Sequence, residues 1–445
     1  MRHHRTMQTS DDPSRPWRRR AVVLVVVLAG ALVSWARLPE DVRGVVWAED
    51  GRLFLQQRLD QGAWSSLVIS YDGYQHLVPR LVTDLVVLVA APGAYAVVLT
   101  ATCCAVVGLV AGAVHLFARP RLRSDVASVG LALVVVLVPV APLEVLGNVA
   151  NLHWYFLFLL PFALLFRPAT TRGTVGQSLA LVLAALTEVQ AVLFLPLVLL
   201  GVRHRRSWPG LAAFVVAVAL QVWSTLTFPR VRGQAPPLGA DDVALGYLAQ
   251  PVTSLVSTSA REASVLLGEH GWRLPVAVLV VVAVAWVTVL AARRSPRSTL
   301  ALVLLVAGPV LWATDVVLNR SPLTEYGEDG AALLEQAGYL RYAVVPAALL
   351  LCGLPLAADR LIDASRPGVR ALAAVPLAAL LAVAVVGGVP DRTTRTDGPD
   401  WSRSVQQVVA DCRDDAPEGR ILGAPAGWDV VVDCVVLVEE GRLAS

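Results

Sequence analysis

The chain has 445 residues, of which 56% are hydrophobic and only 16% are charged, and its mean hydropathy is +0.63. Soluble domains carry about 25% charged residues and are less than half apolar, so this composition excludes a water-soluble enzyme. All 37 basic residues are arginine, which is typical of a GC-rich genome, and the net charge of +3 is small. The arginines form short clusters between apolar runs, which argues against nucleic-acid binding. The composition therefore predicts an all-α polytopic membrane protein.

Residues 1–20 are rich in arginine, and residues 21–36 are apolar. A secretory signal peptide has the same pattern, but many hydrophobic segments follow, so we interpret residues 21–36 as an uncleaved first membrane helix. The further apolar segments are residues 93–117, 125–141, 152–166, 176–202, 208–227, 274–292, 299–318, 339–357 and 369–389.

Residues 176–202 decide the topology. As one helix they would be about 40 Å long, whereas one crossing needs about 30 Å and two need about 60 Å. A single span would also place the arginines after Val202 outside. We therefore predict two short helices with an apex at Thr187, Glu188, Val189 and Gln190, which requires protein or a wet cavity around it. This gives about eleven transmembrane helices.

Arginine clusters separate the apolar segments, and such clusters remain in the cytoplasm. They are Arg119/Arg121/Arg123, Arg167/Arg172, Arg203/Arg205/Arg206, Arg293/Arg294/Arg297 and Arg360/Arg366/Arg370. This predicts a plasma-membrane protein with a cytoplasmic N-terminal tail (1–20) and a transmembrane domain (21–389). The long polar segments are then outer loops (37–92, 228–273 and 319–338) and a small extracytoplasmic C-terminal tail (390–445).

The first outer loop contains W-A-E-D-G at residues 47–51 and Y-D-G-Y-Q-H-L-V-P-R at residues 71–80. Glu49 and Asp50 follow the first helix, and a carboxylate beside a low-dielectric wall has a raised proton affinity that suits a general base. The alternative is that one of them caps a helix that begins near Gly51. Residues 77–91 are predicted to lie in the membrane interface with Arg80 outermost; a further crossing is the alternative.

This loop resembles the first outer loop of the GT-C superfamily, which comprises polytopic glycosyltransferases that use a polyprenyl-phosphate-linked sugar. The architecture is similar over nearly the whole chain, whereas the motifs W-A-E-D-G, F-L and G-Y-x-H-L-V-P-R, which look like those of a bacterial branch, are confined to a few loops. The resemblance implies that an acidic residue after the first helix is the catalytic base. Between Glu49 and Asp50 we prefer Asp50.

Polar and aromatic side chains gather at other predicted outer helix ends and in the first loop. We predict a substrate-binding set made of His153, Asn148, Asn151, Trp154, Glu188, Gln190, Tyr74 and His76. Amides and imidazoles can bond sugar hydroxyls, but Asn151 can also be a helix cap and Trp154 an interface anchor. An ionisable group at membrane depth, such as Glu188, predicts a cavity-facing role, with a structural pairing to arginine as the alternative.

Arg341 lies at the outer end of a predicted helix, where it would bind a lipid phosphate through two parallel hydrogen bonds. In GT-C enzymes a positively charged residue commonly binds the donor phosphate. Arg80 is the competing residue, and a snorkelling Arg341 is the alternative. Asp315, at the outer end of another predicted helix, would pair with either arginine.

Five cysteines fall into two groups. Cys412 and Cys434 lie in the predicted outer tail, where a disulfide can persist and would help a small segment fold; two unpaired thiols are the alternative. Cys103, Cys104 and Cys352 lie in apolar segments and are predicted to be packing residues. The sequence contains no metal-ligand cysteine cluster, P-loop or dinucleotide-binding motif.

These features together predict a membrane glycosyltransferase that moves a sugar from a polyprenyl-phosphate donor to an extracytoplasmic cell-envelope glycan or lipid acceptor. Inversion at the anomeric carbon would follow from a single displacement. A membrane transporter or lipid flippase for envelope precursors is the alternative, because a broken helix with Glu188 is also a transporter feature. A noncatalytic membrane scaffold for envelope assembly is a third hypothesis. No cofactor is firmly implied, and a divalent metal has no support in the sequence.

Overall fold

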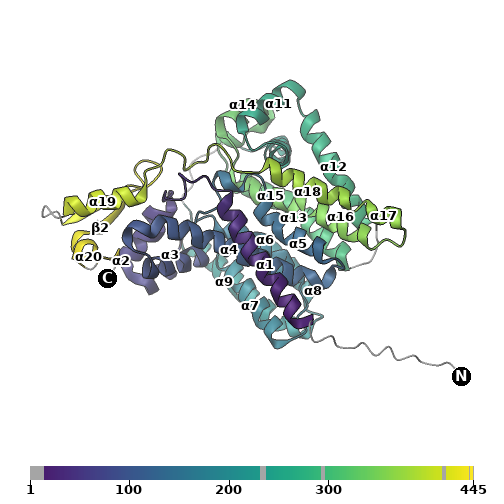
Figure 1. The fold of residues 1–445 in the computed structure, drawn as a ribbon, viewed down its shortest axis with the longest axis horizontal. Helices are drawn as coiled ribbons and strands as arrows, with labels where there is room; N and C mark the ends of the chain where they lie inside the picture. The colour runs from purple at the N-terminus through teal and green to yellow at the C-terminus, as the bar shows by residue number, and fades with distance from the viewer. Residues whose placement is uncertain (1–14, 231–236, 292–295, 413–416, 440, 444–445) are drawn as a thin grey trace.

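The structure is a computed structural model that describes residues 15–230, 237–291, 296–412, 417–439 and 441–443. Helices make up most of it, and a two-stranded sheet lies near the C-terminus (Figure 1). Most of the predicted N-terminal tail (1–14) and the predicted cluster residues Arg293 and Arg294 lie outside the described residues.

Eight helical segments of the described chain are long and apolar enough to cross a membrane. They are Trp17–Ala36, Pro92–Arg121, Asp125–Leu143, Arg205–Thr227, Arg273–Leu290, Arg297–Leu318, Arg341–Ile362 and Pro367–Val386. The helices within them are α1 (Arg15–Ala36), α4 (Tyr95–Ala118), α5 (Asp125–Leu137), α9 (Trp208–Thr227), α12 (Arg273–Leu290), α13 (Pro296–Leu318), α15 (Val344–Leu351), α16 (Gly353–Ile362), α17 (Pro367–Ala371) and α18 (Ala374–Val386). The predicted class, an all-α polytopic protein, is therefore confirmed.

The predicted count of eleven membrane helices is not confirmed, because the other three segments are short. They are α6 (Leu152–Leu165), α7 (Thr171–Ala185), and the 3-10 helix η5 (Val189–Leu197), which continues into α8 (Val198–Gly201). The 14 residues of α6 span about 21 Å, less than the ~30 Å hydrocarbon core.

The helix break predicted between α7 and η5 is present, and polar side chains stabilise it. The Glu188 carboxylate accepts a hydrogen bond from the backbone N–H of Gln190 at 2.8 Å and so caps η5. The Thr187 hydroxyl accepts one from the N–H of Val78, at the start of α3 (Leu77–Val89), at 3.1 Å. The first outer loop is thereby attached to the break.

The centre of the molecule is α6, which is buried at every position. A helix that is apolar all round belongs in a core, and α6 packs against α4, α7, α13 and α15. On the outside of α4 lies α1, whose backbone approaches Gly108 closely: a Cβ there would lie 2.3 Å from the carbonyl oxygen of Val27. Small residues permit such close helix pairs in membranes.

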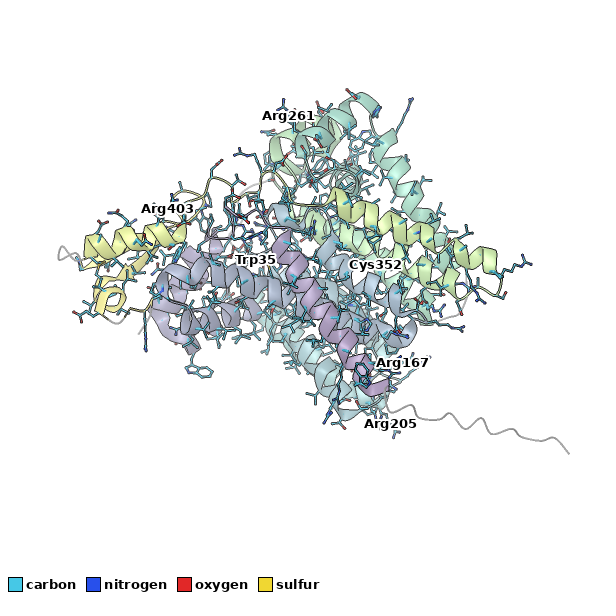
Figure 2. All side chains as sticks on the ribbon, in the orientation of Figure 1. Trp35, Arg167, Arg205, Arg261, Cys352 and Arg403 are labelled. Carbon is cyan, nitrogen blue, oxygen red and sulfur yellow. A yellow bond between two sulfur atoms is a disulfide. The ribbon has the colours of Figure 1, made fainter. Side chains whose placement is uncertain are left out.

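The two ends of the bundle differ. Figure 2 shows Arg167 and Arg205 at the end where α1 begins, and Arg261 and Arg403 toward the opposite end. At the first end the buried carboxylate of Asp359 accepts hydrogen bonds from the N–H groups of Arg123 and Ser124. Arg167 and Arg205 belong to two different predicted cytoplasmic clusters, so these two clusters lie at the same end of the molecule.

The first outer loop folds into η1 (Asp50–Leu55), α2 (Gln56–Leu67), α3 and η2 (Pro92–Ala94). With 13 residues, α3 is too short to cross a ~30 Å core, and it exposes an apolar stripe of Leu81, Leu85 and Leu88, as interfacial helices do. Arg80 is not outermost as predicted: it is only 2% exposed, with its guanidinium 5.3 Å from the ring of Phe54.

The second and third outer loops pack together above α12 (Figure 1). Their elements are α10 (Ala240–Tyr247), η7 (Leu248–Val252), η8 (Thr253–Leu255), α11 (Ala260–His270), η9 (Pro322–Thr324), α14 (Tyr326–Ala337) and η10 (Arg341–Ala343). The buried Gln250 side chain donates to the Tyr326 hydroxyl at 2.8 Å and to the carbonyl oxygen of Gly338 at 2.9 Å. The remaining short helices are η3 (Arg119–Arg121), η4 (Ala141–Leu143) and η6 (Arg205–Ser207).

The C-terminal tail forms α19 (Trp401–Cys412), the antiparallel strands β1 (Glu418–Ile421) and β2 (Val430–Asp433), and α20 (Cys434–Glu439). A disulfide joins Cys412 to Cys434. The tail lies beside α2 and α3 (Figure 1), where the Gln56 side chain both accepts from the N–H of Val431 at 2.8 Å and donates to its carbonyl oxygen at 3.2 Å. The tail is thus joined to the first outer loop.

Candidate functional site

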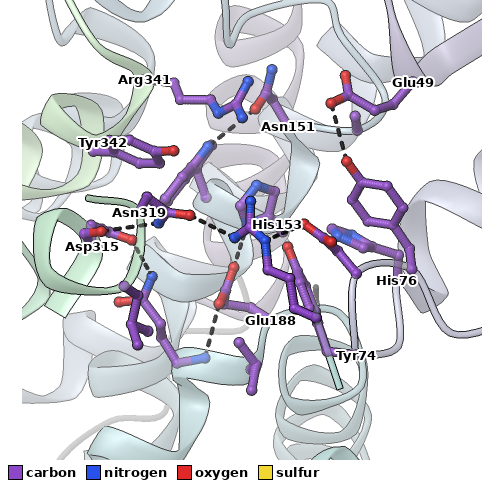
Figure 3. Close-up of a pocket in the computed structure, with 18 of the residues that line it drawn as sticks. Glu49, Tyr74, His76, Asn151, His153, Glu188, Asp315, Asn319, Arg341 and Tyr342 are labelled. Carbon is purple, nitrogen blue, oxygen red and sulfur yellow. Dashed lines mark hydrogen bonds and ion pairs between the residues drawn. The ribbon is translucent and has the colours of Figure 1, made fainter. Parts of the chain in front are cut away.

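A cavity of about 590 Å³ lies at the end of the bundle where α1 ends, enclosed by segments far apart in the sequence (Figure 3). Its walls come from the predicted first outer loop, the start of α6, the break before η5, the C-terminal ends of α9 and α13, and the residues just before α15. It is lined by Glu49, Tyr71, Asp72, Tyr74, His76, Ala150, Asn151, His153, Trp154, Glu188, Val189, Gln190, Thr225, Pro229, Arg230, Asp315, Leu318, Asn319, Arg341 and Tyr342. Nine of these residues belong to the predicted site: Glu49, Tyr74, His76, Asn151, His153, Trp154, Glu188, Gln190 and Arg341.

Buried polar groups form a chain along one wall. Nδ1 of His153 bonds to the Glu188 carboxylate, whose other oxygen caps Gln190. The Gln190 side-chain amide in turn donates to the carboxylate of Asp315 on α13. The helix break therefore brings residues of α6, η5 and α13 together, and Glu188 has histidine rather than arginine as its partner.

Aromatic rings lie beside this polar chain. The imidazole of His76 lies 4.5 Å from the ring centre of Tyr74 and 5.3 Å from that of His153. Burial, and secondarily His153 and Arg80, lower the pKa of His76 well below its usual value. Trp154 donates to the Asn151 side chain at 3.2 Å, so Asn151 is bonded to the indole and does not cap α6 with its side chain.

Glu49 is partly exposed, whereas Glu188 and Asp315 are buried in the cavity wall. The Glu49 carboxylate accepts a hydrogen bond from the Tyr71 hydroxyl at 3.1 Å, and it forms no ion pair with any described residue. Asp72, in contrast, pairs with Arg230 at 2.8 Å. Arg230 also donates to the Asn319 side chain at 2.6 Å and so connects the ends of α9 and α13.

Arg341 lines the cavity with a partly exposed guanidinium, and one nitrogen lies 2.8 Å from the carboxylate of Glu144. A guanidinium has five N–H donors, so this single pairing leaves others for a ligand. Both arginines of the cavity wall, Arg230 and Arg341, are thus held by carboxylates.

Asp50, the preferred base, does not line the cavity. Its buried carboxylate accepts hydrogen bonds from the N–H groups of Val149 and Ala150, each at 2.9 Å. From the tail, Arg395 donates to the carbonyl oxygens of Leu146 at 2.6 Å and Gly147 at 3.0 Å. Asp50 and Arg395, which come from distant segments, therefore both hold the loop that leads into α6.

Two other predicted residues also lie outside the cavity wall. Arg80 is turned toward Phe54, and no hydrogen bond joins its guanidinium to a described residue. Asn148 is fully buried and accepts from the N–H of Asn151 at 3.0 Å, so it shapes the loop. Both side chains are buried in packed protein and do not reach the cavity.

Several polar cavity residues were not predicted from the sequence: Tyr71, Asp72, Thr225, Arg230, Asn319 and Tyr342. The sequence offers a weak signal for four of them: Tyr71 and Asp72 belong to the same loop motif as Tyr74, and Arg230 and Asn319 directly follow long apolar helices. Their convergence on one cavity depends on how α9 and α13 are arranged.

The described residues contain no group of three or more His, Cys, Asp or Glu side chains placed to hold a metal ion.

The fold and the cavity define a polytopic helical membrane protein with a polar site at one end of its bundle. Comparison with known proteins finds no match among family models, curated proteins or solved structures.

Proposed function

We propose that the protein is a membrane glycosyltransferase that transfers a sugar from a polyprenyl-phosphate donor to an extracytoplasmic glycan or lipid acceptor. One observation carries the proposal: Glu49, a carboxylate without an ion-pair partner among the described residues, shares a cavity with the partly exposed Arg341. A base and a phosphate-binding cation in one cavity are the two groups that this reaction requires. The resemblance of the first loop to GT-C enzymes points the same way.

Glu49 replaces Asp50 as the proposed base because only Glu49 lines the cavity. Glu49 removes the proton from an acceptor hydroxyl, and the oxygen attacks the anomeric carbon. The bond between that carbon and the phosphate oxygen breaks, and the phosphate leaves with the electron pair. Arg341 donates hydrogen bonds to the phosphate oxygens as their charge grows. One displacement inverts the anomeric centre.

The remaining polar groups suit recognition of a sugar. Tyr74, His76, Asn151 and Trp154 offer aromatic faces and hydrogen-bonding atoms around the same space. Arg230 is a second cation on the wall, whereas Arg80 has no access to it. We therefore assign the donor phosphate to Arg341.

The test is transfer from a panel of radiolabelled polyprenyl-phosphate hexoses and pentoses to isolated membranes that contain the protein. Glu49→Gln removes the base and should lower transfer by about 10²- to 10⁴-fold. Glu40→Gln, in the same loop with its side chain 93% exposed, is the matched control and should keep full transfer. Full transfer by Glu49→Gln would contradict the assigned base.

A transporter or lipid flippase for envelope precursors is the second candidate, and the broken helix with the buried Glu188–His153 pair favours it. Proteoliposomes separate the two functions. Flux of a lipid-linked sugar without any covalent product would support transport, whereas a new glycosidic bond would support transfer.

A further inference from the structure

Two buried oxygen atoms beside the cavity have no hydrogen-bond partner among the described residues: Oδ2 of Asp315 and Oε1 of Gln190. Asp315 is 1% exposed and Gln190 is 6% exposed, and both line the cavity. The other polar atoms of these two side chains bond each other. A buried acceptor without a donor costs free energy, so this pair calls for a ligand that donates hydrogen bonds.

The charge of the cavity wall points to the kind of donor. Among the described residues, four carboxylates (Glu49, Asp72, Glu188 and Asp315) and two arginines (Arg230 and Arg341) line the cavity. Arg230 is paired with Asp72 and Arg341 with Glu144, so neither forms an ion pair with Asp315. A buried carboxylate in its ionised form is costly unless a cation pairs with it. In Figure 3, Arg341 lies on one side of the cavity and Asp315 lies farther along the same wall.

We propose that Asp315 and Gln190 form a subsite for an ammonium group, and that the cavity binds a zwitterionic lipid head with its phosphate on Arg341. This inference rests on the proposed function and deepens it, because it names an amino sugar as the transferred group. An ammonium combines three N–H donors with a positive charge, which are the two properties that an unpaired carboxylate and an amide oxygen call for. A hydroxyl supplies one donor and leaves the charge unpaired. The head group of an aminophospholipid has the same chemistry.

The experiment measures binding to the full-length protein in phosphatidylglycerol nanodiscs, by the shift of its unfolding temperature with ligand concentration. The probes are the farnesyl phosphates of glucosamine, N-acetylglucosamine and glucose. N-acetylation removes the charge and keeps the sugar. Short-chain phosphatidylethanolamine tests the phospholipid source. Asp315→Asn removes the charge at the subsite, and Asp411→Asn, on the exposed face of α19, is the matched control.

Wild type should bind the glucosamine probe about tenfold or more tightly than the N-acetylated probe, as a desolvated charge pair predicts. In Asp315→Asn the two affinities should come within about twofold, and Asp411→Asn should behave as wild type. Equal binding of the two probes by wild type overturns the inference without any variant. Discrimination that persists in Asp315→Asn overturns it too.

The outcomes also separate this inference from the proposed function. Transfer of sugars without preference for the amino form overturns only the ammonium subsite. Asp315-dependent binding of phosphatidylethanolamine, with no sugar probe bound or transferred, supports the subsite and contradicts the glycosyltransferase. Absence of binding by every probe overturns the subsite.

Discussion

Two adjacent carboxylates of the first outer loop have different surroundings. Glu49 lines the cavity, whereas Asp50 is 2% exposed and bonds two backbone N–H groups nearly a hundred residues away. Neither caps its own helix, since η1 has no side-chain cap. The sequence could not separate the two residues because their difference depends on where the loop before α6 lies.

Asp50 predicts a dependence of stability on pH. Burial raises the pKa of Asp50 to about 7, and its bonds to Ala150 and Val149 lower the pKa by less. The folded protein therefore binds a proton more readily than the unfolded chain, whose Asp pKa is about 3.9. The contribution of Asp50 to stability is therefore fully present below pH ~4 and is lost as the pH rises from there through about 7.

The measurement is the unfolding temperature of the purified protein at pH 5 and pH 8. Wild type should lose more stability between these values than Asp50→Asn, which cannot ionise at this position. Glu40→Gln, an exposed change in the same loop, controls for general effects of charge. An equal pH response in wild type and Asp50→Asn would show that Asp50 does not titrate in this range.

At the scale of elements, the tail and the first loop depend on each other. The backbone of Ala424 pairs with that of Trp47, two residues before Glu49, and the Trp401 indole donates to the carbonyl oxygen of Pro92 at 2.8 Å. Within the tail, the strand Val430–Asp433 is followed directly by α20, which begins at Cys434. The Asp433 carboxylate accepts a hydrogen bond from the N–H of Val435 at 2.7 Å at this transition. The tail therefore packs against the loop that bears Glu49 and stabilises it.

Arg395→Met should destabilise the protein by about 2–4 kcal/mol, because two buried carbonyl oxygens would lose a charged donor. The same loop carries Asn151 and His153 into the cavity, so transfer should fall as well. Arg403→Met, an exposed change on α19, is the control. Each variant is heated to a series of temperatures, and the folded protein that remains is quantified by size-exclusion chromatography to give an unfolding midpoint. Equal midpoints for wild type and Arg395→Met would refute a role for Arg395 in holding the loop.

At the scale of the whole molecule, the tail lies away from the end of the bundle that carries Arg167 and Arg205 (Figures 1 and 2). The cavity includes Glu49, which follows the other end of α1. The positive-inside rule then predicts that the cavity faces outward. Eight helical segments of the described chain are long and apolar enough to cross a membrane, and their orientation is a prediction.

Cysteine labelling tests the orientation. The native thiols Cys103, Cys104 and Cys352 are buried, and Cys412 and Cys434 are bonded to each other. A membrane-impermeant maleimide should therefore label Gln406→Cys on α19 in intact cells, and Ala169→Cys only after the cells are permeabilised. Both positions are exposed. The reverse pattern would place the cavity in the cytoplasm and exclude an extracytoplasmic acceptor.

The sequence by itself determined the class of protein, the positions of the eight long spans and the helix break at Glu188, because apolar length and a polar apex are local properties. The residue types and their positions in the sequence also predicted nine of the residues that line the cavity. Only the tertiary structure decided that Glu49 faces the cavity while Asp50 and Arg395 hold a loop, and that Arg80 is buried. Those outcomes depend on contacts between segments far apart in the chain, for which local composition carries no signal.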